Sequence, residues 1–197
     1  MKKIMFNDKY GLTQAVLEGR KTITRRLIPQ KVIDAYYDYE DAYCSINFGG
    51  VTAVSMTDFL CGCSRYYLGD VLAIAQAYQD IYNGAYHVGL YRGTAGWINK
   101  MFVKADLMPN HIKITNIRVE HLQDISDDDC LREGIRKWDH NNNPFPPAYD
   151  FINSPQSSYK TPREAFAALI DKVSGKGTWE SNPYVWVYEF EPINSKE

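Results

Sequence analysis

The chain has 197 residues, 45% of them hydrophobic and 14% aromatic, so it can bury the core of one domain and is not a disordered tail. Its formal net charge of −2 counts against a protein that holds long nucleic acids by neutralising phosphates, and four cysteines do not make a disulfide scaffold. It has no apolar run near the roughly 20 residues needed to cross a bilayer and no hydrophobic signal segment. We therefore expect a cytoplasmic protein with no membrane partner.

The charge is unevenly distributed along the chain. Residues 1–31 contain eight Lys or Arg and two acidic residues, whereas residues 32–60 contain five acidic residues and no base. The basic segment is compatible with a small anionic or polar ligand. The alternative is that the two segments are solvated faces of opposite charge that partly neutralise each other.

The first predicted element is a helix over residues 8–18, which ends at Gly19. Residues 20–27 are basic and β-prone. A Gly-Asp turn then precedes an apolar run at residues 71–75, which predicts a buried strand. Three other stretches read as insertions or loops: residues 30–60, 78–108 and 136–160.

Residues 111–120 have the composition of a strand, but their apolar positions change parity near Asn116. This pattern predicts a β-bulge at that point. Ser126 begins a short helix with an acidic first turn, which stops at Gly134.

The clearest helix signal is Thr-Pro-Arg-Glu at residues 161–164, a capping residue followed by proline at the first helical position. The residues predicted to pack from this helix are Phe166, Leu169, Ile170 and Val173. The last strand, residues 184–190, has one aromatic face, which is more typical of core than of a base-stacking platform. Because strands and helices do not alternate regularly, we expect one α+β domain over residues 1–197 with a small curved sheet or barrel.

The first candidate site lies in the basic stretch. A lysine amine can take the proton of a threonine hydroxyl only if its pKa falls, and neighbouring cations lower it. Lys21 and Thr24 have such neighbours in Arg20, Arg25 and Arg26. In a regular strand residues 21 and 24 point to opposite faces, so they meet only if Lys21 lies in the turn before the strand. A solvated basic strand is the alternative, and Thr22 is the rival hydroxyl.

Glu133 stands at the end of the short helix, where a carboxylate opposes the helix dipole. A local departure of this kind is mild evidence for a site, and an ordinary exposed glutamate is the alternative. The Cys-Gly-Cys at residues 61–63 has no second cysteine pair, and the four histidines have no ligand spacing. We expect neither a metal nor a cofactor.

Three separated segments carry motifs that belong together: residues 19–26 (GRKTITRR), residues 67–72 (YLGDVL) and residues 122–134 (LQDISDDDCLREG). They resemble the G-x-K-x-x-T-x-R, the Y-x-x-G-D-x-L and the L-x-x-I-s-e-e-d-A-x-x-E-G helix of the ASCH domain family of the PUA-like superfamily. The ending at residues 179–190 is similar to the longer phage- and prophage-type members.

The resemblance implies a small PUA-like β-barrel with flanking helices and a cleft for RNA or nucleobase-type ligands. It also implies a reaction, because a short bacterial member hydrolyses the acetyl amide of N4-acetylcytidine with a Lys–Thr–Glu set. Carried over, Thr24 attacks the carbonyl, Lys21 is the base, and Glu133 orients Lys21 or holds the exocyclic nitrogen. Arg26 then lines the same cleft.

The longer members usually read W-V-R-E after their Gly-Asp turn, and this chain has A-I-A-Q at residues 73–76. Gln76 is therefore a candidate ligand contact that cannot act as an acid or base. The other candidate ligand contacts are Arg20, Arg25 and Arg26. The leading expectation is a protein with a pocket for a modified nucleoside or short RNA element. The concrete form of this expectation is that the protein hydrolyses N4-acyl-cytidine amides. The alternatives are a non-catalytic RNA-binding module and a phage-encoded interaction protein with a vestigial pocket.

Overall fold

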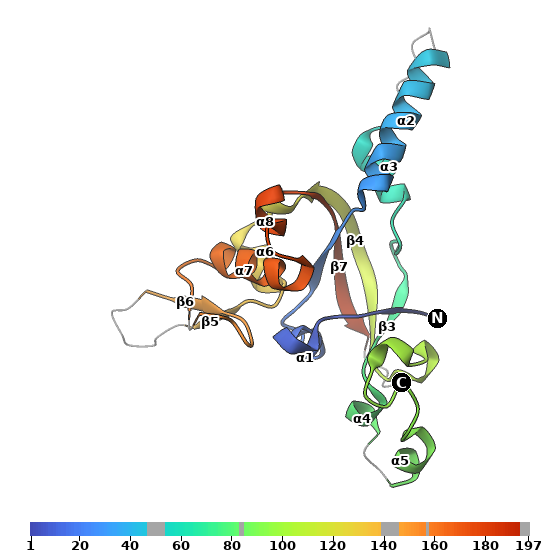
Figure 1. Cartoon of the computed structure of the whole chain (residues 1–197), viewed down its shortest axis with the longest axis vertical. Coiled ribbons are helices and arrows are strands. Elements are labelled where there is room, and N and C mark those ends of the chain that lie inside the picture. Colours follow the sequence, from blue (N-terminus) through green and yellow to red (C-terminus); the bar gives the residue numbers. More distant parts are fainter. Residues whose placement is uncertain (47–53, 83–84, 139–145, 157, 194–197) are drawn as a thin grey trace.

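The computed structural model describes residues 1–46, 54–82, 85–138, 146–156 and 158–193 (Figure 1). The strands are β1 (Lys2–Ile4), β2 (Ile23–Leu27), β3 (Val71–Ile74), β4 (His111–His121), β5 (Arg136–Trp138), β6 (Ala148–Asp150) and β7 (Tyr184–Ile193). The α-helices are α1 (Leu12–Leu17), α2 (Gln30–Ile46), α3 (Met56–Gly62), α4 (Tyr78–Ile81), α5 (Ala85–Tyr91), α6 (Asp127–Arg132), α7 (Pro162–Ser174) and α8 (Thr178–Ser181). Short 3₁₀ turns are η1 (Asp8–Tyr10), η2 (Lys100–Phe102), η3 (Ala105–Leu107) and η4 (Leu122–Asp124).

A five-stranded mixed sheet forms the centre of the molecule, with strand order β1-β3-β4-β7-β2. β1 and β3 are parallel, and the other neighbouring strands are antiparallel. Helices α6, α7 and α8 gather on one flank of this sheet (Figure 1). A largely antiparallel sheet with helices outside it confirms the α+β expectation.

The predicted bulge in β4 is present. Ile114 lies opposite Phe190 of β7, and Asn116 lies opposite Glu189, so the pairing shifts by one residue between them. A bulge bends and twists its strand. As a result, apolar residues on both sides of it pack on the core: Ile112 and Ile114 are fully buried, and Ile117 packs against the same cluster.

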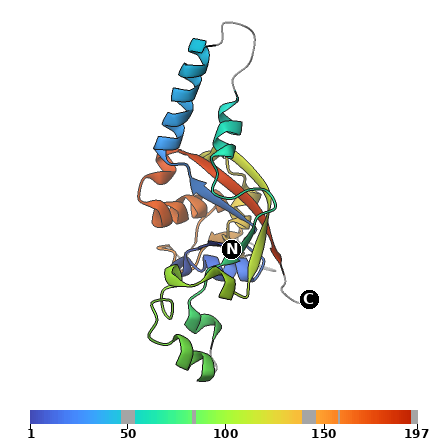
Figure 2. The same cartoon turned by 90° about the vertical axis from the view of Figure 1, so that its right-hand side faces the viewer.

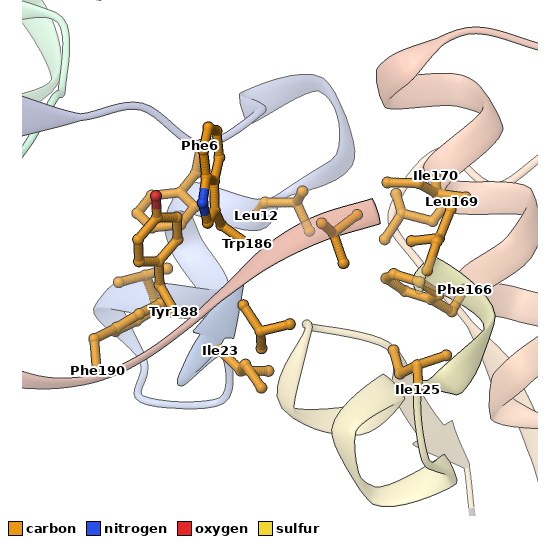
Figure 3. Packing of buried hydrophobic residues seen from close by; sticks show 14 of the residues in the cluster. Phe6, Leu12, Ile23, Ile125, Phe166, Leu169, Ile170, Trp186, Tyr188 and Phe190 are labelled. Atoms are coloured by element: carbon orange, nitrogen blue, oxygen red, sulfur yellow. The ribbon is translucent and has the colours of Figure 1, made fainter. Parts of the chain in front are cut away.

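The main apolar core lies between the sheet, the N-terminal segment and α7 (Figure 3). Thr161 caps α7 as predicted, accepting a hydrogen bond from the backbone N–H of Glu164 at 3.1 Å. The aromatic face of β7 is core as expected, with Tyr188 buried. The expectation that Val173 is buried is wrong: its side chain is 37% exposed, because it lies in the last turn of α7 beyond the core.

The first two insertions extend from opposite ends of the sheet (Figures 1 and 2). Helices α2 and α3 lie side by side, with the Tyr39 and Phe59 rings stacked 5.4 Å apart. At the other end, α4 and the turns after α5 form a second small core around Tyr78, Val103 and Met108.

The expectation that residues 136–160 are loop is wrong in part. Arg136–Trp138 and Ala148–Asp150 pair as a two-stranded antiparallel sheet, joined by the ion pair of Arg136 with Asp150. Proline and asparagine content alone does not show this pairing, because it joins the start of the stretch to residues in its middle. The Asn-Asn-Asn-Pro part of the prediction, residues 141–144, lies outside the described residues.

Candidate active site

A cavity of about 700 Å³ opens between the N-terminal segment, β2 and α7. The residues that line it from α7 are mostly apolar, and those that line it from β2 and the end of α6 are mostly polar. Among the residues that line it are Phe6, Lys21, Thr24, Arg25, Arg26, Lys100, Glu133, Phe166, Leu169 and Ile170. A mixed wall of this kind suits a small ligand with a flat ring and polar edges.

Lys21 reaches the cavity from the turn before β2, as its pairing with Thr24 requires. Gly19 takes a positive φ of 73° and ends α1, and the N–H of Lys21 donates to the carbonyl of Ala15 at 2.9 Å. The Lys21 side chain is buried, and its ammonium donates to the main-chain carbonyl of Glu133 at 2.8 Å and to the Glu133 carboxylate. Burial lowers the pKa of Lys21, and the charges of Arg26 and Arg25 lower it further, so the pKa lies below its ordinary value although the Glu133 carboxylate raises it. The neutral amine is thereby favoured relative to an exposed lysine.

Glu133 is the C-terminal cap of α6, and its carboxylate is held at both oxygens. Ser126 caps the start of the helix, and Gly134 leaves it with a φ of 107°. One Glu133 oxygen accepts from Lys21, and the other accepts from the backbone N–H of Arg25 at 2.8 Å. These donors compensate for a carboxylate placed at the negative end of a helix dipole. The alternative of an ordinary exposed glutamate is therefore wrong, because Glu133 is only 5% exposed.

The structure separates the two candidate hydroxyls. Thr24 lies in β2 opposite Tyr188 and lines the cavity. Thr22 does not line the cavity, and its hydroxyl accepts a hydrogen bond from Arg132 at 3.1 Å. Of the two, Thr24 has the hydroxyl that a ligand in the cavity can meet.

Arg25 is the centre of a buried ion network. Its guanidinium donates to Glu120 at 2.6 Å and to Asp129 at 2.9 Å, and it lies 3.4 Å from Glu133. Burial alone would raise the pKa of Asp129, but the hydrogen bond from Arg25 and the charges of nearby arginines outweigh it and lower that pKa. Since carboxylates take the donors of Arg25, this side chain serves to hold β2 against α6.

The remaining sequence candidates divide between the cavity and other places. Arg26 lines the cavity and donates to the carbonyl of Met5 at 2.6 Å. Arg20 pairs with Glu18 and lines a separate surface groove beside β5. Gln76 accepts a hydrogen bond from Asn110 at 2.7 Å and does not line the cavity. The structure therefore does not bring Arg20 and Gln76 to the candidate site.

Lys100 is a cavity residue that the sequence did not indicate. It comes from the second insertion, and its ammonium donates to Asp8 at 2.6 Å, to Thr13 at 3.0 Å and to the carbonyl of Phe6. These bonds fix the N-terminal segment over the cavity. A lysine in a segment without periodicity gives no signal of such a contact, because its partners are about ninety residues away along the chain.

Over the residues that the structure describes, no group of three or more His, Cys, Asp or Glu side chains is arranged to hold a metal ion. Within the same residues no helix is long and apolar enough to span a membrane. Comparison of the chain with protein-family models, with curated proteins and with solved structures finds no match.

Proposed function

We propose that this chain is an ASCH-like protein whose cavity takes a modified nucleoside or a short RNA element, and that it hydrolyses an N4-acyl amide of cytosine. One observation carries the proposal: Lys21, Thr24 and Glu133, of which the last is more than a hundred residues from the others, line the same cavity. The ASCH resemblance names these same three residues. We further propose that the curved sheet corresponds to the PUA-like barrel of that family.

The lining of the cavity supports a nucleobase as the ligand. Phe166 and Leu169 line it from α7 and Phe6 lines it from the N-terminal segment, so the cavity offers apolar groups to a planar ring. Figure 3 shows Phe6 apart from Phe166 and Leu169. Thr24 and Arg26 provide polar groups for the ring edge. Few polar groups set in an apolar wall are what orients a small ligand in a pocket.

The proposed reaction begins at the Thr24 hydroxyl. Neutral Lys21 takes the hydroxyl proton while the oxygen forms a bond to the amide carbonyl carbon, and the carbonyl electron pair moves to its oxygen. When this pair returns, the C–N bond breaks, and the Lys21 ammonium gives its proton to the exocyclic nitrogen. Water then hydrolyses the acyl-threonine ester, with Lys21 again as the base. The products are the cytosine nucleoside and the free carboxylic acid.

Glu133 has a positioning role in this scheme. Its carboxylate and its main-chain carbonyl both accept from the Lys21 ammonium, which fixes the long lysine side chain beside the strand that carries Thr24. The Arg25 N–H holds the second carboxylate oxygen. Because the Lys21 side chain is already fixed before the reaction, its conformational entropy does not add to the activation barrier.

The test is turnover of N4-acetylcytidine, with release of cytidine followed by chromatography. Wild type should release cytidine, and Thr24→Ala should lower the rate by a factor of about 100 or more, as loss of a nucleophile requires. Thr22→Ala is the matched control, because it removes a hydroxyl two residues away that does not line the cavity. It should keep the wild-type rate.

Equal rates for Thr24→Ala and wild type would overturn the mechanism. Cytidine release by none of the three proteins would overturn the assignment of this substrate.

A further inference from the structure

A second, smaller cavity adjoins the first. It has a volume of about 240 Å³, and it shares Met5 and Arg26 with the larger cavity. The other residues that line it are Lys3, Arg65, Tyr66, Trp186 and Tyr188. One arginine of β2 therefore stands between the two cavities.

The charge of this second cavity is one-sided. Three cations, Lys3, Arg26 and Arg65, line it, and no carboxylate does. None of the three forms an ion pair among the described residues, whereas Lys21 and Arg25 in the larger cavity both do. Lys3 donates to the carbonyls at positions 101 and 103, and Arg26 donates to a carbonyl as well. Because carbonyls are neutral acceptors, these hydrogen bonds do not neutralise the positive charge.

Arg65 is the cation most available to a ligand. Its side chain is exposed, and its guanidinium lies 5.5 Å from the ring centroid of Tyr66. No hydrogen bond of its side-chain donors occurs within the described residues. The five donors of a guanidinium form a planar fork that matches phosphate oxygens, and such charge-assisted pairs are stronger than neutral ones.

The aromatic residues of this cavity have their polar atoms occupied by the protein. The indole N–H of Trp186 donates to the carbonyl of Leu60 at 2.7 Å, and the Tyr188 hydroxyl is hydrogen-bonded to Ser64 at 2.7 Å. The Tyr66 hydroxyl donates to the carbonyl of Lys3 at 3.1 Å. These bonds fix the rings, and the charged groups that a ligand meets in this cavity are all cationic.

One nucleotide can meet residues of both cavities. Thr24 and Arg26 are two residues apart on β2, so they share one face of the strand. Both line the larger cavity, and Arg26 also lines the smaller one. In the proposed reaction the N4 acyl group lies beside Thr24, and the sugar and phosphate lie across the pyrimidine ring from it. A ligand oriented from Thr24 toward Arg26 would therefore bring its phosphate to the smaller cavity.

We propose that the second cavity is a phosphate subsite, and that the ligand is a nucleotide or a nucleotide within RNA, bound more tightly than the free nucleoside. The identity of the base rests on the proposed function, whereas the phosphate subsite rests on three cations, Lys3, Arg26 and Arg65, that line one cavity with no carboxylate in its lining. Arg65 is the residue that discriminates nucleotide from nucleoside.

The test is calorimetric titration of cytidine, cytidine 5′-monophosphate and cytidine 3′-monophosphate into wild type, Arg65→Gln and Arg92→Gln at low salt. Arg92 is an exposed arginine that lines neither cavity, so its variant controls for the loss of one charge. Wild type and Arg92→Gln should bind one of the monophosphates about tenfold or more tighter than cytidine. Arg65→Gln should remove most of this preference and leave cytidine binding unchanged.

Equal affinities for cytidine and both monophosphates in wild type would overturn the subsite. A preference for a monophosphate over cytidine that survives in Arg65→Gln would also overturn it. The same holds if wild type binds none of the three ligands. Turnover of N4-acetylcytidine is measured separately on the same preparations. A protein that prefers the monophosphate but releases no cytidine supports the subsite and counts against the proposed reaction alone.

Discussion

Lys21 is a buried cation whose nearest countercharge is the carboxylate of Glu133. Their side chains are 1% and 6% exposed, so both ions have lost most of their hydration. Desolvation of two charges is repaid only when the pair is intact and well hydrogen-bonded. The two residues should therefore contribute to folding as a unit.

A double-mutant cycle measures this coupling. Lys21→Met leaves the buried Glu133 carboxylate without its nearest cation and should cost about 3–5 kcal/mol of the free energy of unfolding. The double variant Lys21→Met/Glu133→Gln should lose clearly less free energy of unfolding than the sum of the losses of the two single variants. Urea denaturation measures all three losses. The exposed pair of Glu18 and Arg20 is the control, and its cycle should show a much smaller coupling. Additive losses for Lys21 and Glu133 would contradict the ion pair.

At the scale of elements, α6 and the turn after it set the position of Glu133. Ser126 fixes the first turn of the helix, and Gly134 leaves the helix with a φ of 107°. A Cβ atom on Gly134 would lie 3.3 Å from a methyl carbon of Leu12 and 3.8 Å from the Cβ of Lys21. The chain thus needs glycine here for both its backbone conformation and its close packing.

Gly134→Ala should therefore cost more than a strained backbone alone. We expect a loss of about 1–3 kcal/mol in the free energy of unfolding and a lower rate of turnover, because the strain falls beside Glu133. Gly177→Ala is the control: its φ is 87°, and a Cβ atom there meets nothing within 4 Å. It should lose about 1–2 kcal/mol without a change in turnover. Urea denaturation and an activity assay on both variants decide the point, and equal turnover in both would contradict this role for Gly134.

For the molecule as a whole, the ion network around Arg25 joins β2, β4, α6 and β7. Arg118 and Arg132 extend it to Glu189 in β7, and both also contact Asp129 in α6. The hydrogen bond from Arg132 is the main cause of a lowered pKa at Glu189. The pKa of Asp129 is lowered as well, because its arginine partners outweigh the effect of burial.

These lowered pKa values predict a loss of stability in acid. The unfolded chain binds the two protons more readily than the folded one, so this stability is fully present above the ordinary values of 3.8 and 4.5. It is lost as the pH falls through the lowered values. Melting temperatures recorded from pH 6 to pH 3 should fall steeply below about pH 4.5.

A variant and a control locate this effect. Glu189→Gln should melt lower than wild type at pH 6 and lose less on acidification, because one titrating member of the network is gone. Glu191→Gln, an exposed change on the same strand, should reproduce the wild-type drop. An identical drop in all three proteins would show that the network does not carry the acid sensitivity.

Local signals in the sequence predicted much of the framework and part of the site. The parity change near Asn116 predicted the bulge, and Thr161 predicted the start of α7, because both patterns depend on a few consecutive residues. The turn at Gly19 was needed for Lys21 to meet the cavity, and the structure has it. The loop expected over residues 136–160 was partly wrong, since the pairing of β5 with β6 is not a local property.

The α+β class and most caps and turns could be predicted from the sequence alone, because propensity and capping are local. The grouping of Lys21, Thr24 and Glu133 was a prediction from a family resemblance, and the structure places all three on one cavity. Three outcomes required the folded chain: Thr24 rather than Thr22 lines the cavity, carboxylates hold Arg25, and Arg20 and Gln76 lie elsewhere. Each of these outcomes depends on contacts between segments far apart in the chain. These placements are selected by packing and by the cost of burying an unpaired charge, and no local sequence pattern encodes either.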